Sequence, residues 1–255
     1  MSMILAIDSG NSFFKWGLKK DAIWLTKGEI SNKEIYHLFN TFKKLPSPLH
    51  IIISHVAANL LQDELEEAIL SIWAVKPHWI KARVFQCGVL NCYRNPEQLG
   101  SDRWAALVAA WNFNQRACIV VNVGTAVTID ALSDSGEFLG GVIMPGIYLM
   151  RESLQSGTKI RTLLTGTFQD FPQSTDDAVH TGLVHSVLGA IEHFYYRVST
   201  QLNEPALKCF ISGGGSSELT PFIEIPFQVI DNLVLEGLII IAHDIMFNQN
   251  KMSND

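Results

Sequence analysis

The sequence predicts an α/β fold built from two similar halves, each with the element order β-β-β-α-β-α-β. Three observations support this prediction. Hydrophobic residues make up 47% of the 255 residues and charged residues 17%, so a substantial core is available. The order of expected elements restarts near residue 115, and each half carries a similar glycine-containing turn. A repeated order of this kind indicates a duplicated fold. We expect a first half over residues 1–114, a second over 115–248 and a polar tail over 249–255.

Short apolar runs bounded by polar turns predict the strands of the first half. These runs are Met3–Asp8, Phe13–Leu18, Ile23–Lys27, His50–Ser54 and Arg83–Gln86. Helical spacing of apolar residues predicts the helices, with Ser31 as an N-cap of the first. The expected helices are Ser31–Phe42, Leu60–Trp73 and one running from Ser101 to about Asn114.

The second half repeats this pattern. Its expected strands are Cys118–Asn122, Ala126–Leu132, Phe138–Ile143, Lys208–Ile211 and Phe227–Ile230. Its expected helices are Tyr148–Leu154, Asp176–Val198 and Leu233–Phe247.

The turn after the first strand is similar in the two halves. The segments are LAIDSGNSFFKWGL and IVVNVGTAVTIDAL. In each, a strand is followed by Asp or Asn, then by any residue, then by Gly, then by Asn or Thr, and then by a second strand. One such turn fits an ordinary hairpin, which favours the same residues. Two copies indicate a paired function, because glycine turns expose backbone N–H groups that bind phosphate and a neighbouring acid can hold a cation. No G-x-x-x-x-G-K-[ST] segment occurs, which disfavours a P-loop kinase.

This pair of turns resembles the actin-like ATPases and sugar kinases, whose duplicated ribonuclease H-like halves flank a nucleotide cleft. The segment YRNPEQLGSDRWAALVAAW, from Tyr93 to Trp111, narrows the resemblance to the type III pantothenate kinases. The family pattern contains a Tyr, an Asn-Pro and then G-x-D-R-W-x-A. The resemblance implies ATP-dependent phosphorylation of pantothenate to 4′-phosphopantothenate, the first step of coenzyme A biosynthesis.

The resemblance assigns Asp102 as the catalytic base. The pantothenate-binding residues it implies are Tyr93, Gly100, Ser101, Asp102, Arg103 and Thr175. The chemistry agrees, because a carboxylate can accept the proton of the attacking hydroxyl and Arg can pair with the carboxylate of pantothenate. The alternatives are an acid stabilising a helix N-terminus for Asp102 and a surface ion pair for Arg103.

The resemblance places ATP on the two turns and on a later glycine segment. The implied ATP- and phosphate-binding residues are Asp8, Ser9, Gly10, Asn11, Ser12, Lys15, Gly124, Thr125, Gly213 and Gly214. Asp8 is also expected to hold Mg²⁺ through the phosphates, and Thr128 to add a hydroxyl donor. Lys15 could instead be a solvated strand lysine.

One position departs from the family pattern. The second turn usually opens with Asp, whose carboxylate helps to bind the monovalent cation of these enzymes, whereas this chain has Asn122. A carboxamide oxygen can ligate K⁺ or NH₄⁺ but brings no charge, which puts the cation requirement in doubt.

The sequence also bears on partners and location. A formal net charge of −6 disfavours nucleic acid as a partner. No segment reads as a membrane span, and four cysteines without a C-x-x-C pair suit a reducing compartment, so we expect a cytoplasmic protein. An apolar stripe on the expected helix Asp176–Val198 predicts a homodimer, unless the stripe serves the chain's own core. It comprises Val179, Leu183, Val187, Ala190, Ile191 and Phe194. The family resemblance adds that the dimer completes the pantothenate pocket, with Thr175 near the shared boundary.

Two other functions remain open at this point. A non-catalytic relative could act as an accessory factor in transcriptional regulation, although Asp8, Lys15, Asp102 and Arg103 are all retained. A kinase or phosphatase of the same superfamily could act on a sugar, acetate or polyphosphate. That function would explain both turns but not the segment from Tyr93 to Arg103.

Overall fold

The computed structural model describes residues 2–34, 36–57, 62–158 and 166–252. Contacts divide the chain into two units. The first comprises Met1–Phe113 together with Asn232–Asp255, and the second comprises Asn114–Asp231.

The first unit contains a five-stranded sheet in the order β3-β2-β1-β4-β5. Strands β1, β2 and β3 form an antiparallel meander, and β4 and β5 continue the sheet in parallel with β1. The bounds are β1 Met3–Ser9, β2 Phe13–Lys20, β3 Ile23–Ser31, β4 His50–His55 and β5 His78–Trp79.

The second unit repeats this arrangement strand for strand. Its strands follow the order β10-β9-β8-β11-β12, again with an antiparallel meander and two parallel additions. The bounds are β8 Cys118–Val123, β9 Ala126–Leu132, β10 Glu137–Pro145, β11 Lys208–Ser212 and β12 Phe227–Val229. The predicted duplication is confirmed.

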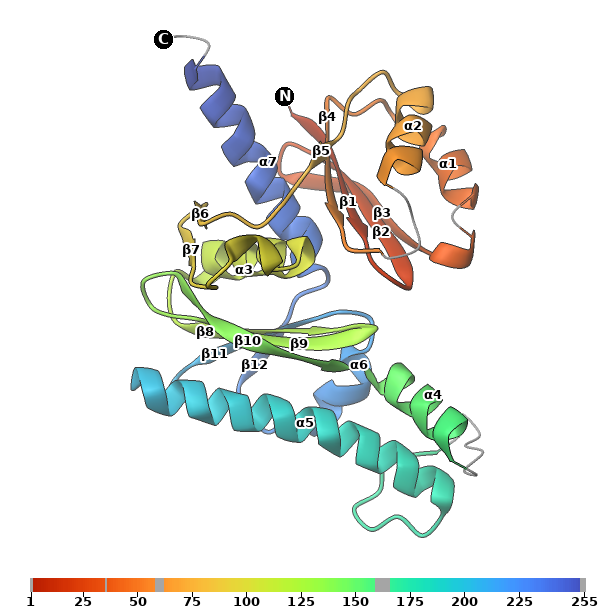
Figure 1. Cartoon of the computed structure of the whole chain (residues 1–255), viewed down its shortest axis with the longest axis vertical. Coiled ribbons are helices and arrows are strands. Elements are labelled where there is room, and N and C mark those ends of the chain that lie inside the picture. Colours follow the sequence, from red (N-terminus) through yellow and green to blue (C-terminus); the bar gives the residue numbers. More distant parts are fainter. Residues whose placement is uncertain (1, 35, 58–61, 159–165, 253–255) are drawn as a thin grey trace. The chain divides into compact units, whose positions relative to one another are not determined.

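Helices cover these sheets (Figure 1). The first unit holds α1 Tyr36–Phe42, α2 Gln62–Ile72, α3 Ser101–Asn114 and α7 Leu233–Met252, with a hairpin of β6 Phe85–Gln86 and β7 Val89–Asn91. The second holds α4 Ile147–Gly157, α5 Thr175–Leu202 and α6 Ser216–Leu219, with α5 running along β8 and β9. Short 3₁₀ turns occupy Asn32–Glu34, Pro96–Gln98 and Thr220–Phe222.

Strand β1 is covered on both faces, which explains its nearly continuous apolar sequence. Leu5 and Ile7 pack into one core with residues of α1 and α2. Because side chains alternate along a strand, Ile4, Ala6 and Asp8 point to the opposite face. Helix α7 packs there on β1 and β4. The first candidate acid therefore lies at the end of a buried strand, on the face that α7 covers.

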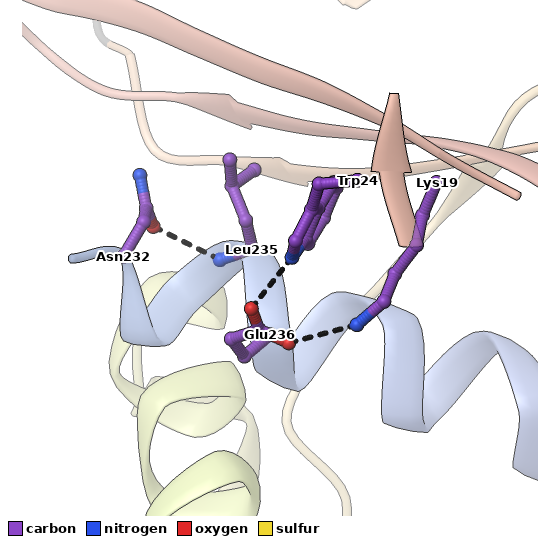
Figure 2. A network of polar contacts seen from close by, with 5 residues as sticks. All are labelled: Lys19, Trp24, Asn232, Leu235 and Glu236. Atoms are coloured by element: carbon purple, nitrogen blue, oxygen red, sulfur yellow. Dashed lines mark hydrogen bonds and ion pairs between the residues drawn. The ribbon is translucent and has the colours of Figure 1, made fainter. Parts of the chain in front are cut away.

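The first turns of α7 are fixed to the sheet of the first unit (Figure 2). Asn232 accepts a hydrogen bond from the backbone N–H of Leu235 at 3.0 Å and so caps the helix. Glu236 accepts one hydrogen bond from Trp24 Nε1 at 2.7 Å and another from Lys19 Nζ at 3.0 Å. Any side chain at Gly237 would overlap the backbone of Ala105 in α3. Helix α7 thus links the sheet to the helix that begins with Ser101.

The placement of this last helix corrects the sequence-based division. We expected Leu233–Phe247 to belong to the second half, whereas α7 packs in the first unit. The apolar pattern indicates that the helix is buried. It does not indicate which sheet the helix packs on, because the two sheets are similar. The boundary near residue 114 agrees with the division between the units.

Several element bounds also differ from the prediction. Strand β3 runs to Ser31, so Ser31 is a strand residue rather than a helix cap, and the helix that follows begins at Tyr36. Residues 60 and 61 of the expected second helix lie outside the described residues. The predicted strand Arg83–Gln86 is shorter in the structure and corresponds to β6, Phe85–Gln86. Strand β5 was not predicted, because a strand of two residues shows too little alternation of apolar and polar residues to be detected.

The apolar stripe on α5 packs within the second unit. Leu183, Val187 and Ile191 are buried in its core, and Val179, Ala190 and Phe194 pack against the same core. The stripe is therefore accounted for within the chain and does not by itself provide a dimer surface. In the part of the chain that the structure describes, no helix is both long and apolar enough to cross a membrane.

Candidate active site

A row of polar side chains crosses the sheet of the first unit near the ends of β1 and β4. Asp8 is paired in register with Lys15 of β2 and with Ser54 of β4, and Lys15 is paired with Glu29 of β3. Register partners share a face of the sheet, so these four side chains line one face. The Lys15 ammonium lies 4.0 Å from the Glu29 carboxylate, which is exposed. Lys15 thus stands between Asp8 and Glu29 in this row of register partners.

The turn after β1 is closed by backbone bonds and by a residue that sequence reasoning missed. The Gly10 N–H donates to the Phe13 carbonyl at 3.1 Å. Asn32 Nδ2 donates to the carbonyls of Gly10 and Asn11 at 2.7 and 3.0 Å, and the Asn32 N–H donates to the Ser12 carbonyl at 3.0 Å. One asparagine therefore fixes the conformation of the whole turn. It lies beyond β3, and no motif links it to the turn.

Asp8 is in an unusual environment for a carboxylate. Its Oδ1 is buried and has no hydrogen-bond partner among the described residues. Burial raises the pKa of Asp8 to about 7, the negative charge of Asp102 adds to the rise, and Lys15 partly opposes it. A buried oxygen without a partner is expensive unless a ligand satisfies it, so Asp8 fits the role of a group that meets Mg²⁺ or a donor on bound substrate.

The candidate base stands at the start of α3. The Asp102 Oδ1 accepts a hydrogen bond from the backbone N–H of Arg103 at 2.8 Å. A Cβ on Gly100 would lie 2.6 Å from the same oxygen, so the position requires glycine while the carboxylate keeps this orientation. Burial raises the pKa of Asp102, and the hydrogen bond and charge of Arg103 partly offset that rise. A carboxylate with a raised pKa accepts a proton more readily.

Arg103, the residue after this acid, lies together with Tyr93. Arg103 Nη1 donates to Tyr93 Oη at 3.2 Å, and its guanidinium carbon lies 5.8 Å from the centre of the Tyr93 ring. Asn91 orders the approach to this pair, because its Oδ1 accepts from the Tyr93 N–H at 3.1 Å and its Nδ2 donates to the Pro96 carbonyl at 3.1 Å. Arg103 is buried, which excludes the surface ion pair considered above.

The second turn lies in the second unit and is closed by the same kind of bond. The Gly124 N–H donates to the Ala126 carbonyl at 3.0 Å, and the Gly146 N–H donates to the Thr125 carbonyl at 2.9 Å. Gly213 has φ of 103°, a conformation that favours glycine, and a side chain there would overlap the Val123 backbone. The later glycine segment therefore packs directly against the strand that leads into the second turn.

Asn122 occupies the position in the second unit that Asp8 occupies in the first. Asp8 is paired in register with Lys15 and Ser54, and Asn122 is paired with Thr128 and Ser212 on the equivalent strands. The duplication therefore places a carboxamide where the first unit has a carboxylate. Within the described residues, no group of three or more His, Cys, Asp and Glu side chains could hold a metal ion.

The structure thus groups the predicted residues unit by unit. Asp8, Lys15, Asp102, Arg103 and Tyr93 belong to the first unit. The second unit contains the turn with Gly124 and Thr125, the glycines Gly213 and Gly214, and Thr175, the first residue of α5. Sequence reasoning missed Asn32, Ser54 and Asn91, which contact the motif residues but belong to no motif.

The duplicated sheets and the two turns define the fold of this chain, which is that of the actin-like ATPases and sugar kinases. Solved structures agree in fold: a chain from Campylobacter jejuni described as a Baf family transcriptional activator has a TM-score of 0.57 and 20% identity, with 96% of this chain and 99% of that chain covered. MreB 5 of Spiroplasma citri, solved with AMPPNP, has a TM-score of 0.52 at 8% identity, with 98% and 99% covered.

Sequence comparison identifies the family. The family model of type III pantothenate kinases matches residues 4–197. A type III pantothenate kinase from Nitrosomonas eutropha is 45% identical over 254 residues, with 98% of each chain covered. Another, from Nitrosospira multiformis, is 44% identical over 242 residues, with 95% of this chain and 92% of the relative covered. The chain belongs to the type III pantothenate kinase family.

Proposed function

We propose that the chain transfers the γ-phosphoryl group of ATP to the 4′-hydroxyl of pantothenate, with Asp102 as the general base. Family membership makes the chain an ATP-dependent pantothenate kinase that acts in coenzyme A biosynthesis. The observation that carries the residue assignment is the half-buried Asp102 carboxylate, which is oriented by the Arg103 N–H and feels the charge of Arg103, whose guanidinium in turn contacts Tyr93.

The acceptor is bound by groups around that carboxylate. The Arg103 guanidinium supplies a charge-assisted partner for the carboxylate of pantothenate, and the Tyr93 hydroxyl offers a further polar contact. One oxygen of Asp102 is occupied by the Arg103 N–H, which fixes the direction of the other. As the bond to phosphorus forms, Asp102 accepts the proton of the hydroxyl, so the acceptor oxygen attacks without carrying a positive charge.

Each of the two turns is a phosphate-binding segment of its own unit. Asn11 and Ser12 supply polar groups from the first turn, and Thr125 supplies them from the second. Gly10 and Gly124 use their N–H groups to close the turns and, having no side chains, let the phosphates approach the backbone. Lys15 adds a positive charge next to Asp8. Mg²⁺ bound with ATP supplies charge neutralisation at the transferring phosphoryl group, and Asp8, with its unpartnered buried oxygen, is the residue that would hold it. Ser9, Gly213 and Gly214 complete the proposed ATP site.

Asn122 is proposed as a weak ligand of a monovalent cation. It occupies the position equivalent to Asp8 and offers one carboxamide oxygen without charge. Such an oxygen is a suitable ligand for K⁺ or NH₄⁺, but a site lacking the carboxylate binds cations less strongly.

We further propose that the enzyme is a cytoplasmic homodimer in which Thr175 helps to bind pantothenate. Family membership and the position of Thr175 at the start of α5 support this, whereas the apolar stripe of α5 does not, because it packs in the core of the second unit. Sedimentation equilibrium at micromolar concentration should give twice the mass of the 28.4 kDa chain. A monomer would contradict the dimer.

An ADP-release assay over several acceptors tests the function. Pantothenate should be turned over with ATP, whereas acetate and hexoses should not. Asp102→Asn should lower kcat by about 10²–10⁴-fold, the range for losing a positioned general base. Asp63→Asn is the matched control, because Asp63 is an exposed acid in the first turn of α2. If both variants kept the parent kcat, Asp102 would be a helix N-terminal acid and not the base.

A further inference from the structure

Two buried serines join the sheet of the first unit to the start of α3. Ser54, the last residue but one of β4, is 0% exposed, and Ser101, the first residue of α3, is 7% exposed. Their Oγ atoms lie 2.9 Å apart, within hydrogen-bond distance, and either hydroxyl can donate. Buried hydroxyls that bond to each other avoid the cost of leaving one of them unsatisfied.

This bond lies between the two acids of the candidate site. Ser54 is the register partner of Asp8 in the parallel pair of β1 and β4. Ser101 immediately precedes Asp102, and the charge of Asp102 acts on Asp8. A single hydrogen bond therefore connects the strand beside one acid with the helix turn that carries the other.

The start of α3 is constrained on both sides of this bond. Gly100 leaves room for the Asp102 carboxylate, and the Trp104 N–H donates to the Gly100 carbonyl at 2.9 Å as the helix begins. Further along, Ala105 is in close contact with Gly237 of α7. The serine pair adds a direct hydrogen bond between the first turn of α3 and β4.

We infer that Ser54 is a positioning residue for phosphoryl transfer, which sets the place of Asp102 by holding Ser101 against the end of β4. The inference rests on the proposed role of Asp102 as base. Ser54 is fully buried, so it acts through Ser101 rather than by touching pantothenate. Displacements of about 1 Å at a reacting group can lower a rate by about 10²-fold, so a lost tether affects turnover before it affects binding.

Ser54→Ala tests the inference through kcat and KM measured separately. We expect kcat to fall about 10-fold, which is less than the full effect of misplacing a reacting group. The KM values for pantothenate and Mg–ATP should stay within about twofold of those of the parent. The acid limb of the kcat profile should also move to lower pH, because a looser start of α3 lets water reach Asp102. Loss of folded protein alone would scale the profile without moving it.

Ser133→Ala is the matched control. Ser133 is also a buried serine with hydrogen-bonded Oγ, accepting from the Glu137 N–H at 3.0 Å, but it follows β9 in the second unit. Its removal should leave kcat per folded molecule unchanged. An equal fall of kcat in Ser133→Ala, or an unchanged kcat in Ser54→Ala, would overturn the inference.

A double-mutant cycle with Ser101→Ala identifies the partner. If Ser54 acts through Ser101, the double variant should have the kcat of the Ser54 variant, because the second change removes nothing further. Additive losses would refute the tether. Ser54→Cys, nearly the same size, is used if Ser54→Ala does not fold. Because a thiol forms weaker hydrogen bonds than a hydroxyl, the kcat of Ser54→Cys should lie between that of the parent and that of Ser101→Ala. A kcat equal to that of the parent would again refute the tether.

The assignment of the base is tested separately in the same assay. If Asp102→Asn keeps the turnover of the parent, the proposed role of Asp102 fails. If Asp102→Asn loses turnover while Ser54→Ala behaves like the parent, only the positioning role of Ser54 fails.

Discussion

Two carboxylates of the first unit differ in how their oxygens are satisfied. Glu236, near the start of α7, uses both oxygens, one on Trp24 and one on Lys19, and the same lysine lies 4.8 Å from the centre of the Trp24 ring (Figure 2). Asp8, at the end of β1, keeps Oδ1 buried without a partner among the described residues. Lys15, its register neighbour on β2, lies near a different carboxylate, that of Glu29.

The difference separates a group that holds the fold from a group kept for a ligand. A fully hydrogen-bonded carboxylate fixes the geometry around it, whereas a buried oxygen without a partner destabilises the folded chain. Removing Glu236 should therefore reduce stability with little effect on turnover. Removing the charge of Asp8 should instead increase stability and reduce turnover.

Of the changes that test this comparison, Asp8→Ala has the largest expected effect, and it acts on the use of Mg–ATP. We expect kcat/KM for Mg–ATP to fall by about 10²–10³-fold, the scale for removing one group that stabilises developing charge. Pantothenate binding, measured by calorimetry, should change much less, because Asp8 lies beside the first turn, which we propose binds phosphate. A larger loss of pantothenate affinity than of Mg–ATP use would place Asp8 in the acceptor site.

Glu236→Ala should lower the free energy of unfolding by about 1–3 kcal/mol, because Trp24 Nε1 and Lys19 Nζ lose their shared acceptor. Urea unfolding measures this loss, and kcat per folded molecule should remain that of the parent. Glu67→Ala, which removes an exposed glutamate of α2, is the control and should change stability by less than about 0.5 kcal/mol. A large fall in kcat for Glu236→Ala would make its network part of the active site.

The smallest expected effect concerns Asn122, the uncharged equivalent of Asp8 in the second unit. Asn122→Asp should lower the K⁺ or NH₄⁺ concentration that gives half-maximal rate, by a few-fold, because a carboxylate attracts the cation more strongly than a carboxamide. Initial rates over a K⁺ titration measure the change. Superimposable curves for parent and variant would leave Asn122 as a turn residue only.

The sequence was sufficient to predict the parts of the molecule that carry local patterns. The duplicated strand order followed from the repeated order of expected elements and from two similar turns. The segment from Tyr93 to Arg103 was recognised as a motif, and its two end residues are hydrogen-bonded to each other. It did not predict that α7 packs on the first sheet, because a helix with buried residues fits either of two similar sheets.

The supporting residues of the site could not be predicted for a related reason. Asn32 closes the first turn from beyond β3, and Ser54 reaches α3 from β4, 47 residues earlier in the chain. Polar residues of these types are common in turns and strand ends, so only their contacts in the folded chain distinguish them.

The most direct test of the comparison is the stability of Asp8→Asn relative to the parent as a function of pH, in metal-free buffer without nucleotide. Burial raises the pKa of Asp8 from 3.8 to about 7. Between these pH values the folded chain keeps a proton that the unfolded chain has lost, so the parent loses stability as pH rises through this window. The loss is complete above pH 7 and amounts to at most about 4 kcal/mol.

The side chain of Asn carries no charge at any of these pH values. Asp8→Asn should therefore be close to the parent in stability near pH 4 and more stable than the parent at pH 8, by at most about 4 kcal/mol. Urea unfolding at several pH values gives the difference directly. A variant that is less stable than the parent at pH 8 would show that the Asp8 carboxylate is satisfied within the folded chain. That result would contradict the view that Asp8 is left unpaired for a ligand.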